Sequence, residues 1–407
     1  MKKVVQINTV ANSGSTGRIA EEIGLRAIAR GWESYVAYGR GTPRSASHLI
    51  RIGSDLDMRW HGLETRLLDN HGLSSRRATR AFVRRLREIK PDIVHLHNIH
   101  GYYLNYKILF RYLAEAGVPV VWTLHDCWSF TGHCSHFIFT KCDRWKTDGC
   151  RKCAHKRMYP GSALLSRSAA NYSDKKAAFC KPQNVTMVPV SHWMEGLLRE
   201  SFLKGHKVHC ICNGVDVNVF TAPADRDALR EKLGVGAREI LVLGVSSVWN
   251  ESKGLNDFAL LRESLPAEYK MVLIGLKDEQ IAALPAGITG VGRTRNQQEL
   301  AQWYGAADVF ANPTHADTFP TVNMESLACG TPVVTYSGTG GSEEQVDEYT
   351  GRVAPEGDIQ VMAAAIKDVV SRPEMRQACR ERALRLYNKE DRFSEYVDLY
   401  ESILENK

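Results

Sequence analysis

Two carboxylates flank a proline turn in the second half of the chain, at a spacing that suits a ligand with hydroxyl and phosphate groups. Asp317 precedes Phe319-Pro320, and Glu325 stands about one turn inside the helix expected to begin at Thr321. Proline is tolerated at a helix start because the amide that it lacks would be unpaired there. The amides after it and the helix dipole can therefore face an anion. The pattern predicts a nucleotide-sugar site, although a helix cap (Asp317) and a solvated helix residue (Glu325) would explain either residue alone.

The longer stretch from His315 to Val346 carries a characteristic order of small and apolar residues. After the two carboxylates come Ala328-Cys329-Gly330-Thr331-Pro332-Val333-Val334 and then Gly340-Gly341-Ser342-Glu343-Glu344. This order resembles the signature of the family 4 retaining glycosyltransferases, which have the GT-B fold, with Asp317 where the family has glutamate. The resemblance spans nearly the whole chain and is strongest over residues 240–346. It implies transfer of a sugar from a nucleotide-diphospho-sugar with retention at the anomeric carbon.

The resemblance also implies roles for single residues. Lys253-Gly254 matches the family's Lys-Gly, whose lysine neutralises the donor diphosphate as it gains negative charge. A solvated loop lysine is the alternative for Lys253. Asp317 is expected to hold hydroxyls of the donor sugar, Glu325 the ribose, and His125 the sugar 6-position or the developing positive charge. The helix start completes the expected donor site with Pro320, Thr321 and Val322.

One cation of the family pattern is missing. The family usually has an arginine five or six residues before the lysine, where this chain has Val248 and Ser247. Arg293 or Arg295 is expected to compensate. Both lie in a segment that corresponds to the family's usual site for the nucleotide base.

Polar segments near the N-terminus are expected beside the acceptor. A strand at 4–7 leads into the loop NTVANSGSTG and then into a helix, a geometry that lets backbone approach a phosphate closely. The loop has neither the dinucleotide fingerprint nor a Walker lysine. It resembles the family's N-terminal loop, which lies against the donor phosphates and the acceptor, so Gly17 is expected on the donor side. The residues expected on the acceptor side are Asn12, Ser13, Gly14, His97 and Asn98.

An unusual insert at about residues 127–160 has the spacing C-x7-C-x7-C-x2-C, formed by Cys134, Cys142, Cys150 and Cys153. Tetrahedral zinc takes four soft ligands, and a Cys-x2-Cys pair places two sulfurs on one side. Disulfides are rare in a reducing compartment, so structural zinc is the first interpretation. Reduced free cysteines and a redox disulfide are the alternatives. Four thiolates would leave no open position for water, so we expect such a metal to be structural.

The composition is that of a globular protein, with 43% apolar and 24% charged residues and a net charge of +7. No apolar run approaches the roughly 20 residues that span a bilayer, and the short run after Met1-Lys2-Lys3 fits a first strand better than a signal peptide. We expect a cytoplasmic protein. The basic amphipathic segment Arg76–Lys90 predicts contact with an anionic membrane at the inner face, or else an ordinary solvated helix face. No nucleic-acid motif accompanies its charge.

Alternating strands and helices must position these residues. Strand-like runs alternate with helical stretches in both halves, which predicts parallel βαβ units whose ligands gather beyond the carboxyl ends of the strands. The length favours two domains. We expect an α/β GT-B fold of two Rossmann-like domains, with doubly wound parallel sheets and a cleft between them. The acceptor domain is expected at 1–183, with a final helix at 386–407 packing back on it, and the donor domain at 184–385.

The sequence thus predicts a metal-independent, retaining hexosyltransferase that uses a UDP-sugar in preference to a GDP-sugar. The acceptor that the resemblance suggests is a glycan or lipid-linked saccharide of surface polysaccharide biosynthesis, and catalysis requires no cofactor. Two rivals stay open. A nucleotide-sugar epimerase of the same fold would need an acid and a base at C2 and no acceptor groove. A non-catalytic, zinc-stabilised binder of nucleotide-sugars or polyanions would fit Asp317 and the missing arginine.

Overall fold

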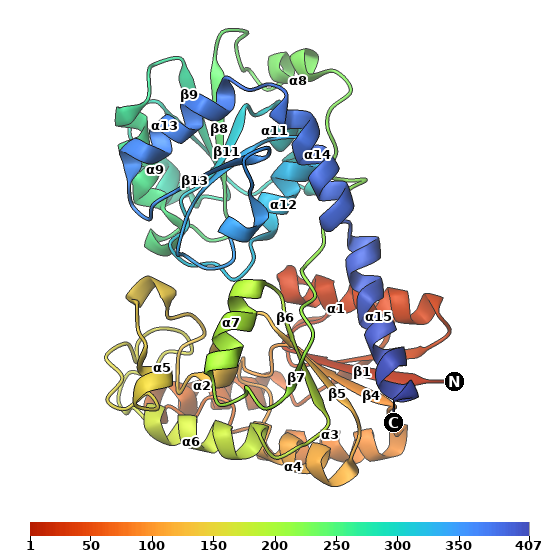
Figure 1. The fold of residues 1–407 in the computed structure, drawn as a ribbon. Coiled ribbons are helices and arrows are strands. Elements are labelled where there is room, and N and C mark those ends of the chain that lie inside the picture. Colours follow the sequence, from red (N-terminus) through yellow and green to blue (C-terminus); the bar gives the residue numbers. More distant parts are fainter. Residues whose placement is uncertain (407) are drawn as a thin grey trace. The chain divides into compact units, whose positions relative to one another are not determined.

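The computed structural model describes residues 1–406, and the chain divides into two compact units (Figure 1). The N-terminal unit comprises residues 1–212 and the end of the chain from Phe393 onward. The C-terminal unit comprises Asn213–Arg392. Among the described residues, no helix has both the length and the apolar character that a bilayer crossing requires.

The N-terminal unit is built on one sheet of seven parallel strands in the order β3-β2-β1-β4-β5-β6-β7. The order reverses beside β1, so the switch point lies between β1 and β4, where ligands of such sheets bind. The strands are β1 Lys3–Asn8, β2 Glu33–Tyr38, β3 His48–Arg51, β4 Ile93–Leu96, β5 Val120–Leu124, β6 Val185–Pro189 and β7 Lys207–Val208.

Both faces of this sheet are covered because its central strands are apolar on both sides. Val4 of β1 packs toward α1 and α15, whereas Val5 and Ile7 join the larger core beneath α3, α4 and α6. Such two-sided burial is typical of parallel sheets. The helices of this unit are α1 Gly14–Ala29, α2 Asp55–Leu68, α3 Arg76–Ile89, α4 Tyr106–Ala116, α5 Arg144–Thr147, α6 Ser168–Phe179, α7 His192–Glu200 and α15 Lys389–Glu405, with 3₁₀ turns at Trp128–Phe130 and Ile138–Thr140.

The C-terminal unit repeats this architecture with six parallel strands in the order β10-β9-β8-β11-β12-β13. Helices α9 and α13 pack on one face, and α11 and α12 contact the sheet as well. The strands are β8 Ile240–Val245, β9 Tyr269–Ile274, β10 Ile288–Val291, β11 Val309–Asn312, β12 Val333–Tyr336 and β13 Gly351–Ala354. The helices are α8 Arg226–Lys232, α9 Leu255–Ser264, α10 Asp278–Ala282, α11 Gln297–Ala306, α12 Thr321–Ala328, α13 Ile359–Val370 and α14 Met375–Leu386, with 3₁₀ turns at Glu251–Lys253 and Glu343–Gln345.

The border between the units lies later in the chain than the sequence suggests. The strand β6, which begins near the predicted border at residue 184, pairs with β5 from Val120↔Val185 to Leu124↔Pro189 and so extends the N-terminal sheet. The division falls instead between Cys212 and Asn213. At the other end of the chain, α15 buries Phe393 and three further side chains against the N-terminal sheet, namely Tyr396, Val397 and Tyr400.

Candidate active site

The predicted donor residues follow neighbouring strands of the C-terminal unit. Lys253 lies in the turn after β8, Asp317 in the loop after β11, and Gly338–Gly341 in the loop after β12. β8, β11 and β12 are adjacent in the sheet, and the carboxyl ends of parallel strands meet at one edge. The fold therefore brings these three loops together.

Lys253 and Asp317 are in direct contact. The Lys253 ammonium donates to Asp317 Oδ2 and, over 3.2 Å, to the carbonyl of Ala316. The turn that carries Lys253 is fixed by Asn250, whose side-chain oxygen accepts from the Lys253 amide at 3.1 Å. An ammonium has three hydrogens, so these contacts leave one for a ligand. The two residues that the sequence separates by 64 positions thus form one half-buried ion pair.

Backbone contacts hold the Asp317 loop against the loop after β12. The Asp317 amide donates to Thr339 O at 3.0 Å, and the Gly341 amide donates to Asp317 O at 3.0 Å. Gly340 between them has φ +128°, and a Cβ there would lie 1.7 Å from Asp317 O. Only glycine permits this approach. The glycines of the signature therefore position the carboxylate.

His315, for which the sequence predicted no role, holds the start of the same loop through contacts with two carboxylates. Its Nε2 lies 2.9 Å from an oxygen of Asp257 at the start of α9, and its Nδ1 lies 3.0 Å from Glu356. The hydrogen bond to Asp257 is the main reason why the pKa of His315 is raised above its usual value. Tyr336 of β12 also donates to Asp257, at 3.0 Å. A histidine that opens a polar loop was the available signal, but its two carboxylate partners are distant in sequence.

Helix α12 begins as the sequence predicts. Pro320 occupies the N-cap with φ −67° and offers no side-chain cap, unlike Asn296 and Asp358, which cap α11 and α13. The first-turn residues Thr321 and Val322 are partly buried. One turn later, Glu325 accepts a hydrogen bond from Tyr304 of α11 at 3.1 Å. This contact fixes Glu325, so the solvated-residue alternative does not describe it.

The two arginines predicted to replace the missing cation lie on the loop after the edge strand. Arg293 and Arg295 are exposed in the loop after β10, the edge strand of this sheet. Arg295 pairs with Glu299 of the following helix at 3.1 Å. Ser247 and Val248, which stand where the family has arginine, are both exposed. Compensation by either arginine stays a prediction.

The predicted acceptor-side residues also follow adjacent strands, which are β1 and β4 of the N-terminal unit. The loop after β1 closes on itself, since the Asn12 amide donates to Gly17 O at 3.1 Å. Ser13 and Gly14 are exposed at the start of α1. The Asn98 amide donates at 3.2 Å to Oδ1 of Asn8, the last residue of β1, where this loop begins.

A chain of hydrogen bonds sets the tautomer of His125, which follows β5. Gln6 donates from Nε2 to Ala20 O at 2.7 Å, so its Oε1 faces His97 Nε2 at 3.0 Å. An amide oxygen only accepts, so His97 carries its proton on Nε2 and accepts at Nδ1. His125 Nε2 lies 3.0 Å from that Nδ1 and must donate to it. When both rings are neutral, His125 therefore keeps its lone pair at Nδ1.

Burial keeps both of these rings neutral. It lowers the pKa of His125 to about 4 and the pKa of His97 well below its usual value. The neighbouring Asp126 accepts from His100 Nε2 at 2.8 Å and from the Trp128 amide at 2.9 Å. Burial alone would raise the pKa of Asp126, but His100, His136 and the Trp128 amide together lower that pKa to about 2. The buried Gln6 within an apolar strand was the sequence signal for this network.

Comparison with known proteins identifies the family of this chain. Residues 16–219, half of the chain, match the family described as Glycosyltransferase Family 4, and residues 225–385 match Glycosyl transferases group 1. The chain belongs to glycosyltransferase family 4. The putative colanic acid biosynthesis glycosyl transferase WcaC of Escherichia coli strain K12 is 24% identical to it over 98% of this chain and 100% of WcaC.

Solved structures show that this glycosyltransferase has the GT-B fold. Sucrose-phosphate synthase from Thermosynechococcus elongatus matches with a TM-score of 0.74 at 18% identity, over 100% of both chains. The Anabaena protein HepE in complex with UDP-glucose matches with a TM-score of 0.67 at 15% identity, over 99% of this chain and 100% of that one. The predicted family and fold are thus confirmed. The roles of individual residues stay predictions.

The cysteine insert of this glycosyltransferase is partly buried. Cys134 and Cys150 are buried, whereas Cys142 and Cys153 are half-buried. Burial raises the pKa of Cys134 to about 12 and that of Cys150 to about 11, although the Gly132 amide donates to the Cys150 sulfur at 3.2 Å. Zinc would bind them as thiolates, but no three of the four insert sulfurs lie within 4.8 Å of one another. Zinc in the insert therefore stays a prediction.

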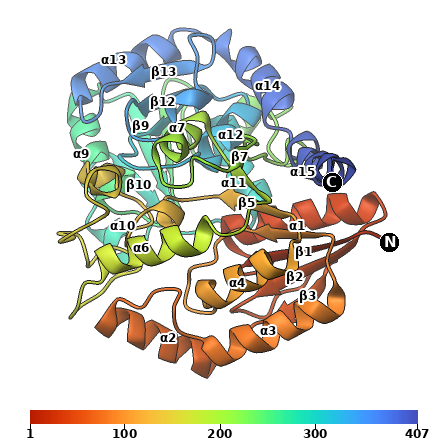
Figure 2. The ribbon, with the colours of Figure 1, turned by 60° about the horizontal axis from the view of Figure 1, so that its bottom comes forward.

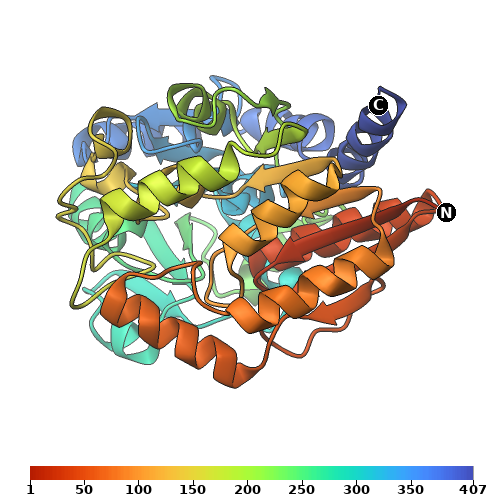
Figure 3. The ribbon, with the colours of Figure 1, turned by 90° about the horizontal axis from the view of Figure 1, so that it is seen from below.

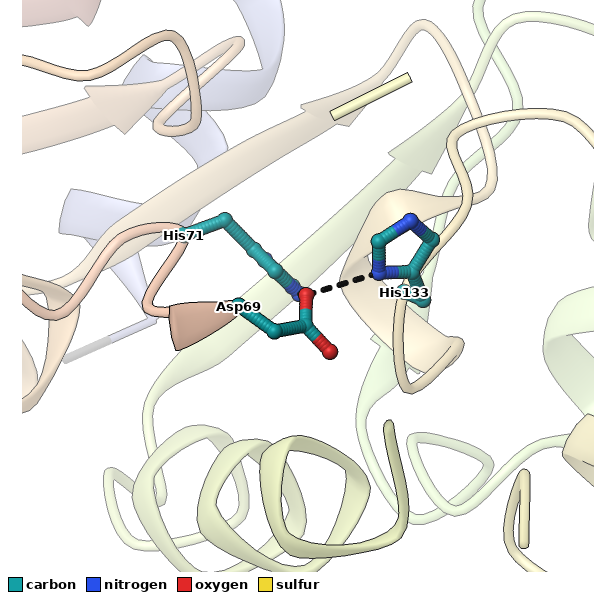
Figure 4. A group of neighbouring side chains, drawn as sticks. All are labelled: Asp69, His71 and His133. Atoms are coloured by element: carbon teal, nitrogen blue, oxygen red, sulfur yellow. Dashed lines mark hydrogen bonds and ion pairs between the residues drawn. The ribbon is translucent and has the colours of Figure 1, made fainter. Parts of the chain in front are cut away.

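Two groups outside the insert cysteines do have three ligand atoms within 4.8 Å of one another among the described residues. One is the half-exposed group His192, Glu195 and Cys210, and the other is the buried group Asp69, His71 and His133 (Figure 4). Neither includes a cysteine of the insert. The first lies on and beside α7, where Glu195 also pairs with Arg199.

The buried group of Figure 4 is complete without an ion. Trp128 Nε1 donates to His71 Nδ1 at 2.8 Å, and Asn171 Nδ2 lies 3.0 Å from His71 Nε2. His133 faces acceptors on both sides, with Asp69 2.8 Å from Nδ1 and Met158 O 3.0 Å from Nε2. Protein groups thus already contact every ring nitrogen of both histidines. The group instead ties the end of α2 to the insert.

Proposed function

We propose that this glycosyltransferase moves a hexosyl residue from a nucleotide-diphospho-sugar to a saccharide acceptor with retention at the anomeric carbon. UDP is the proposed carrier in preference to GDP, because HepE, a protein of the same fold, binds UDP-glucose. The acceptor is a glycan or lipid-linked saccharide of surface polysaccharide biosynthesis, in keeping with the name of WcaC. The reaction takes place in the cytoplasm at the inner face of the membrane, with the basic segment Arg76–Lys90 toward anionic lipid.

The observation that carries the proposal is the contact between Lys253 and Asp317. The leaving diphosphate gains negative charge as the glycosidic bond breaks, and a fixed ammonium in a half-buried position stabilises that charge. Because Asp317 and Ala316 use two of its three hydrogens, Lys253 can donate one to a phosphate oxygen without moving. The uncapped amides at the start of α12 add a second anion-binding element.

The proposed mechanism is a front-side displacement. The acceptor oxygen bonds to the anomeric carbon on the face from which the diphosphate leaves, and the leaving phosphate oxygen takes the acceptor proton. Asp317 holds hydroxyls of the donor sugar, Glu325 the ribose, and His125 the 6-position or the developing positive charge. Side chains and helix dipole stabilise the diphosphate, so the proposal requires no divalent metal.

One of the two rivals has specific support. The exposed Ser247 and Val248, in place of a family arginine, and the shorter Asp317 would suit a protein that binds nucleotide-sugars without transferring them. The pattern of Lys253 and Asp317-x7-Glu325 argues against an epimerase of the same fold, which would need no acceptor. Each rival predicts a different response to acceptor.

A donor screen separates the three. UDP- and GDP-sugars, with and without lipid-linked saccharides, are incubated with the parent protein, and released nucleotide is measured together with the anomeric configuration of the product. A transferase releases one nucleotide, faster with acceptor, and gives a product of retained configuration. Epimerisation without acceptor dependence favours the epimerase. Binding without release under every condition favours the non-catalytic binder.

The insert is proposed to hold one structural zinc through Cys134, Cys142, Cys150 and Cys153. Elemental analysis of the purified protein is expected to show about one zinc per chain. The Cys150→Ser variant should lose it, whereas Cys379→Ser, a buried cysteine of the C-terminal unit, should not. Absence of metal together with four titratable thiols in the insert would remove the proposal.

A further inference from the structure

Helix α2 turns an apolar face away from its own unit. The side chains it buries, His61 and Thr65, lie on the face toward the unit. The opposite face follows the spacing i, i+4, i+7, i+11, which aligns residues on one side of a helix. It consists of Leu56, Trp60, Leu63 and Leu67, which we call the α2 stripe. Leu56 is 74% exposed and Trp60 61% exposed.

The stripe is not needed to form or hold the helix. Ser54 and Asp57 make a capping box at its start, and Asp69 ends it in the left-handed conformation. Burial of His61 and Thr65 attaches it to the unit. Four large apolar side chains on one exposed face are therefore unexplained by folding, and contiguous exposed apolar surface marks an interaction site.

A second segment enlarges the same surface. The segment 162–166 runs along the last turn of α2, where the amides of Ala163 and Leu165 donate to Arg66 O and Leu67 O at 2.7 and 3.2 Å. Leu164 and Leu165 of this segment are 64% and 53% exposed. A segment that is distant from α2 in sequence thus adds two leucines beside the stripe.

Unpaired positive charge adjoins this apolar surface. Figure 2 and Figure 3 show α2 and α3 on the same outer side of the unit. On α3, four exposed arginines form no ion pair with any described residue, and they are Arg76, Arg77, Arg80 and Arg84. Two hollows flank the start of α3. One of about 900 Å³ includes Arg51, Arg77 and Arg85, and one of about 350 Å³ includes Arg76, Arg80 and Arg167.

We propose that the α2 stripe, with Leu164 and Leu165, inserts into the interface of an anionic lipid bilayer while the α3 arginines contact lipid phosphates. Leucine and tryptophan on one helix face, flanked by basic side chains, are the pattern of helices that lie in a membrane surface. Tryptophan favours the depth of the headgroups. Basic residues near such a surface add attraction to its negative potential.

The charges favour a bilayer over a second copy of this chain. Two copies that faced each other through this surface would bring the same unpaired arginines together, and such like-charge contacts repel. A bilayer with anionic lipids can bury the apolar surface and balance the positive charge. The inference extends the membrane contact proposed above, and it does not depend on which sugar is transferred.

Vesicle flotation of the full-length protein tests the inference. Vesicles of phosphatidylcholine with phosphatidylglycerol are compared with phosphatidylcholine alone. The double variant Trp60→Ser/Leu63→Ser is expected to bind the anionic vesicles about tenfold more weakly, since two large apolar side chains no longer leave water. The matched control Leu260→Ser/Leu384→Ser removes two exposed leucines of the C-terminal unit and should bind like the parent. Arg80→Gln/Arg84→Gln should weaken binding and reduce its sensitivity to salt.

Fluorescence gives an independent readout at one residue. The parent should show a blue shift and quenching by brominated lipid, and Trp60→Phe should keep vesicle binding while losing most of that change among the 8 tryptophans. Equal binding by parent and Trp60→Ser/Leu63→Ser would overturn the inference. So would a parent that dimerises through the stripe and ignores vesicles. Nucleotide release without vesicles should be the same in all these variants, so failure of the transfer reaction is seen separately.

Discussion

At the scale of single residues, the proposed chemistry depends on Lys253 and Asp317. Their side chains are 29% and 25% exposed and pair directly, so each fixes the other before any ligand arrives. Asp317 is one methylene shorter than the glutamate of the family pattern, and the structure gives this shorter carboxylate a lysine partner. Preorganised charge is effective because it costs no reorganisation when the diphosphate leaves.

The charge of Asp317 can be removed while its shape is kept. Asp317→Asn is expected to lower kcat/KM for the donor about 100-fold, because the neutral amide neither fixes the Lys253 ammonium nor accepts from sugar hydroxyls as strongly. Steady-state nucleotide release measures this. Glu279→Gln, which neutralises an exposed carboxylate of the same unit, should leave the rate unchanged. Parent-like turnover of Asp317→Asn would contradict the assigned role.

The tautomer of His125 is a second residue-scale prediction. Ring nitrogen NMR of histidine-labelled protein should show both His97 and His125 protonated at Nε2, since Gln6 and Ala20 impose that order. Gln6→Leu should release His97 into a mixture of tautomers. A proton at Nδ1 of His125 in the parent would refute the assignment. With a lone pair there, His125 can accept from a sugar hydroxyl but would repel a carboxylate at that position.

At the scale of elements, backbone contacts between loops fix the geometry of the candidate site. The loops after β8, β11 and β12 are short, and close backbone contacts at Gly254 and Gly340 fix them, where a Cβ would lie 2.1 Å from Pro313 O and 1.7 Å from Asp317 O. Both glycines also have positive φ. The glycines of the sequence motif are therefore required by the backbone geometry of these loops, apart from any contact with a ligand.

Gly340→Ala should destabilise the C-terminal unit by roughly 3 kcal/mol, because the new methyl group must displace the Asp317 carbonyl. Gly338→Ala is the matched control. Gly338 also has positive φ, +70°, but a Cβ there would meet nothing within 4 Å. The control should cost only about 1 kcal/mol, the usual penalty of a left-handed alanine. Urea unfolding measures both, and equal losses would show that the contact with Asp317 O is unimportant.

The two units differ in their charge states at the scale of the whole molecule. The N-terminal unit buries neutral histidines, and burial lowers the pKa to about 4 for His61 and His125 and well below the usual value for His95 and His97. The C-terminal unit holds His315 between two carboxylates, with a raised pKa. Their stabilities should therefore respond to pH in opposite directions.

The signs follow from proton uptake. Histidines with a lowered pKa bind protons only when the N-terminal unit unfolds, so its stability is full above about pH 6.5 and falls below it, by roughly 1.4 kcal/mol per pH unit for each group. His315 binds its proton more tightly when folded, so its contribution is present below about pH 6.5 and is lost as pH rises through the folded pKa. Hydrogen exchange of β4 and β12 peptides between about pH 5 and about pH 8 reports both, after correction for intrinsic rates.

His315→Gln should remove the loss of stability that β12 shows at high pH. His48→Gln, which replaces an exposed histidine, should leave the pH response of both units unchanged. Parallel pH responses of the two units would contradict this account.

The sequence predicted the family, both sheets and the donor loops, because strand alternation and glycine motifs are local signals. It misplaced the border at 184, since an apolar strand such as β6 does not reveal which sheet it joins. It also missed His315 and Gln6. Their partners, Glu356 and His97, lie 41 and 91 positions away, and only the fold brings them into contact.

The role of Lys253 is tested most directly by the single-turnover rate of nucleotide release at saturating UDP-sugar and acceptor for Lys253→Ala. We expect a rate at least about 100-fold below the parent, the usual loss when one stabilising donor to the leaving charge is removed. Lys367→Ala, an exposed lysine on α13, should match the parent. Release by Lys253→Ala at the parent's rate would show that this lysine does not stabilise the leaving diphosphate.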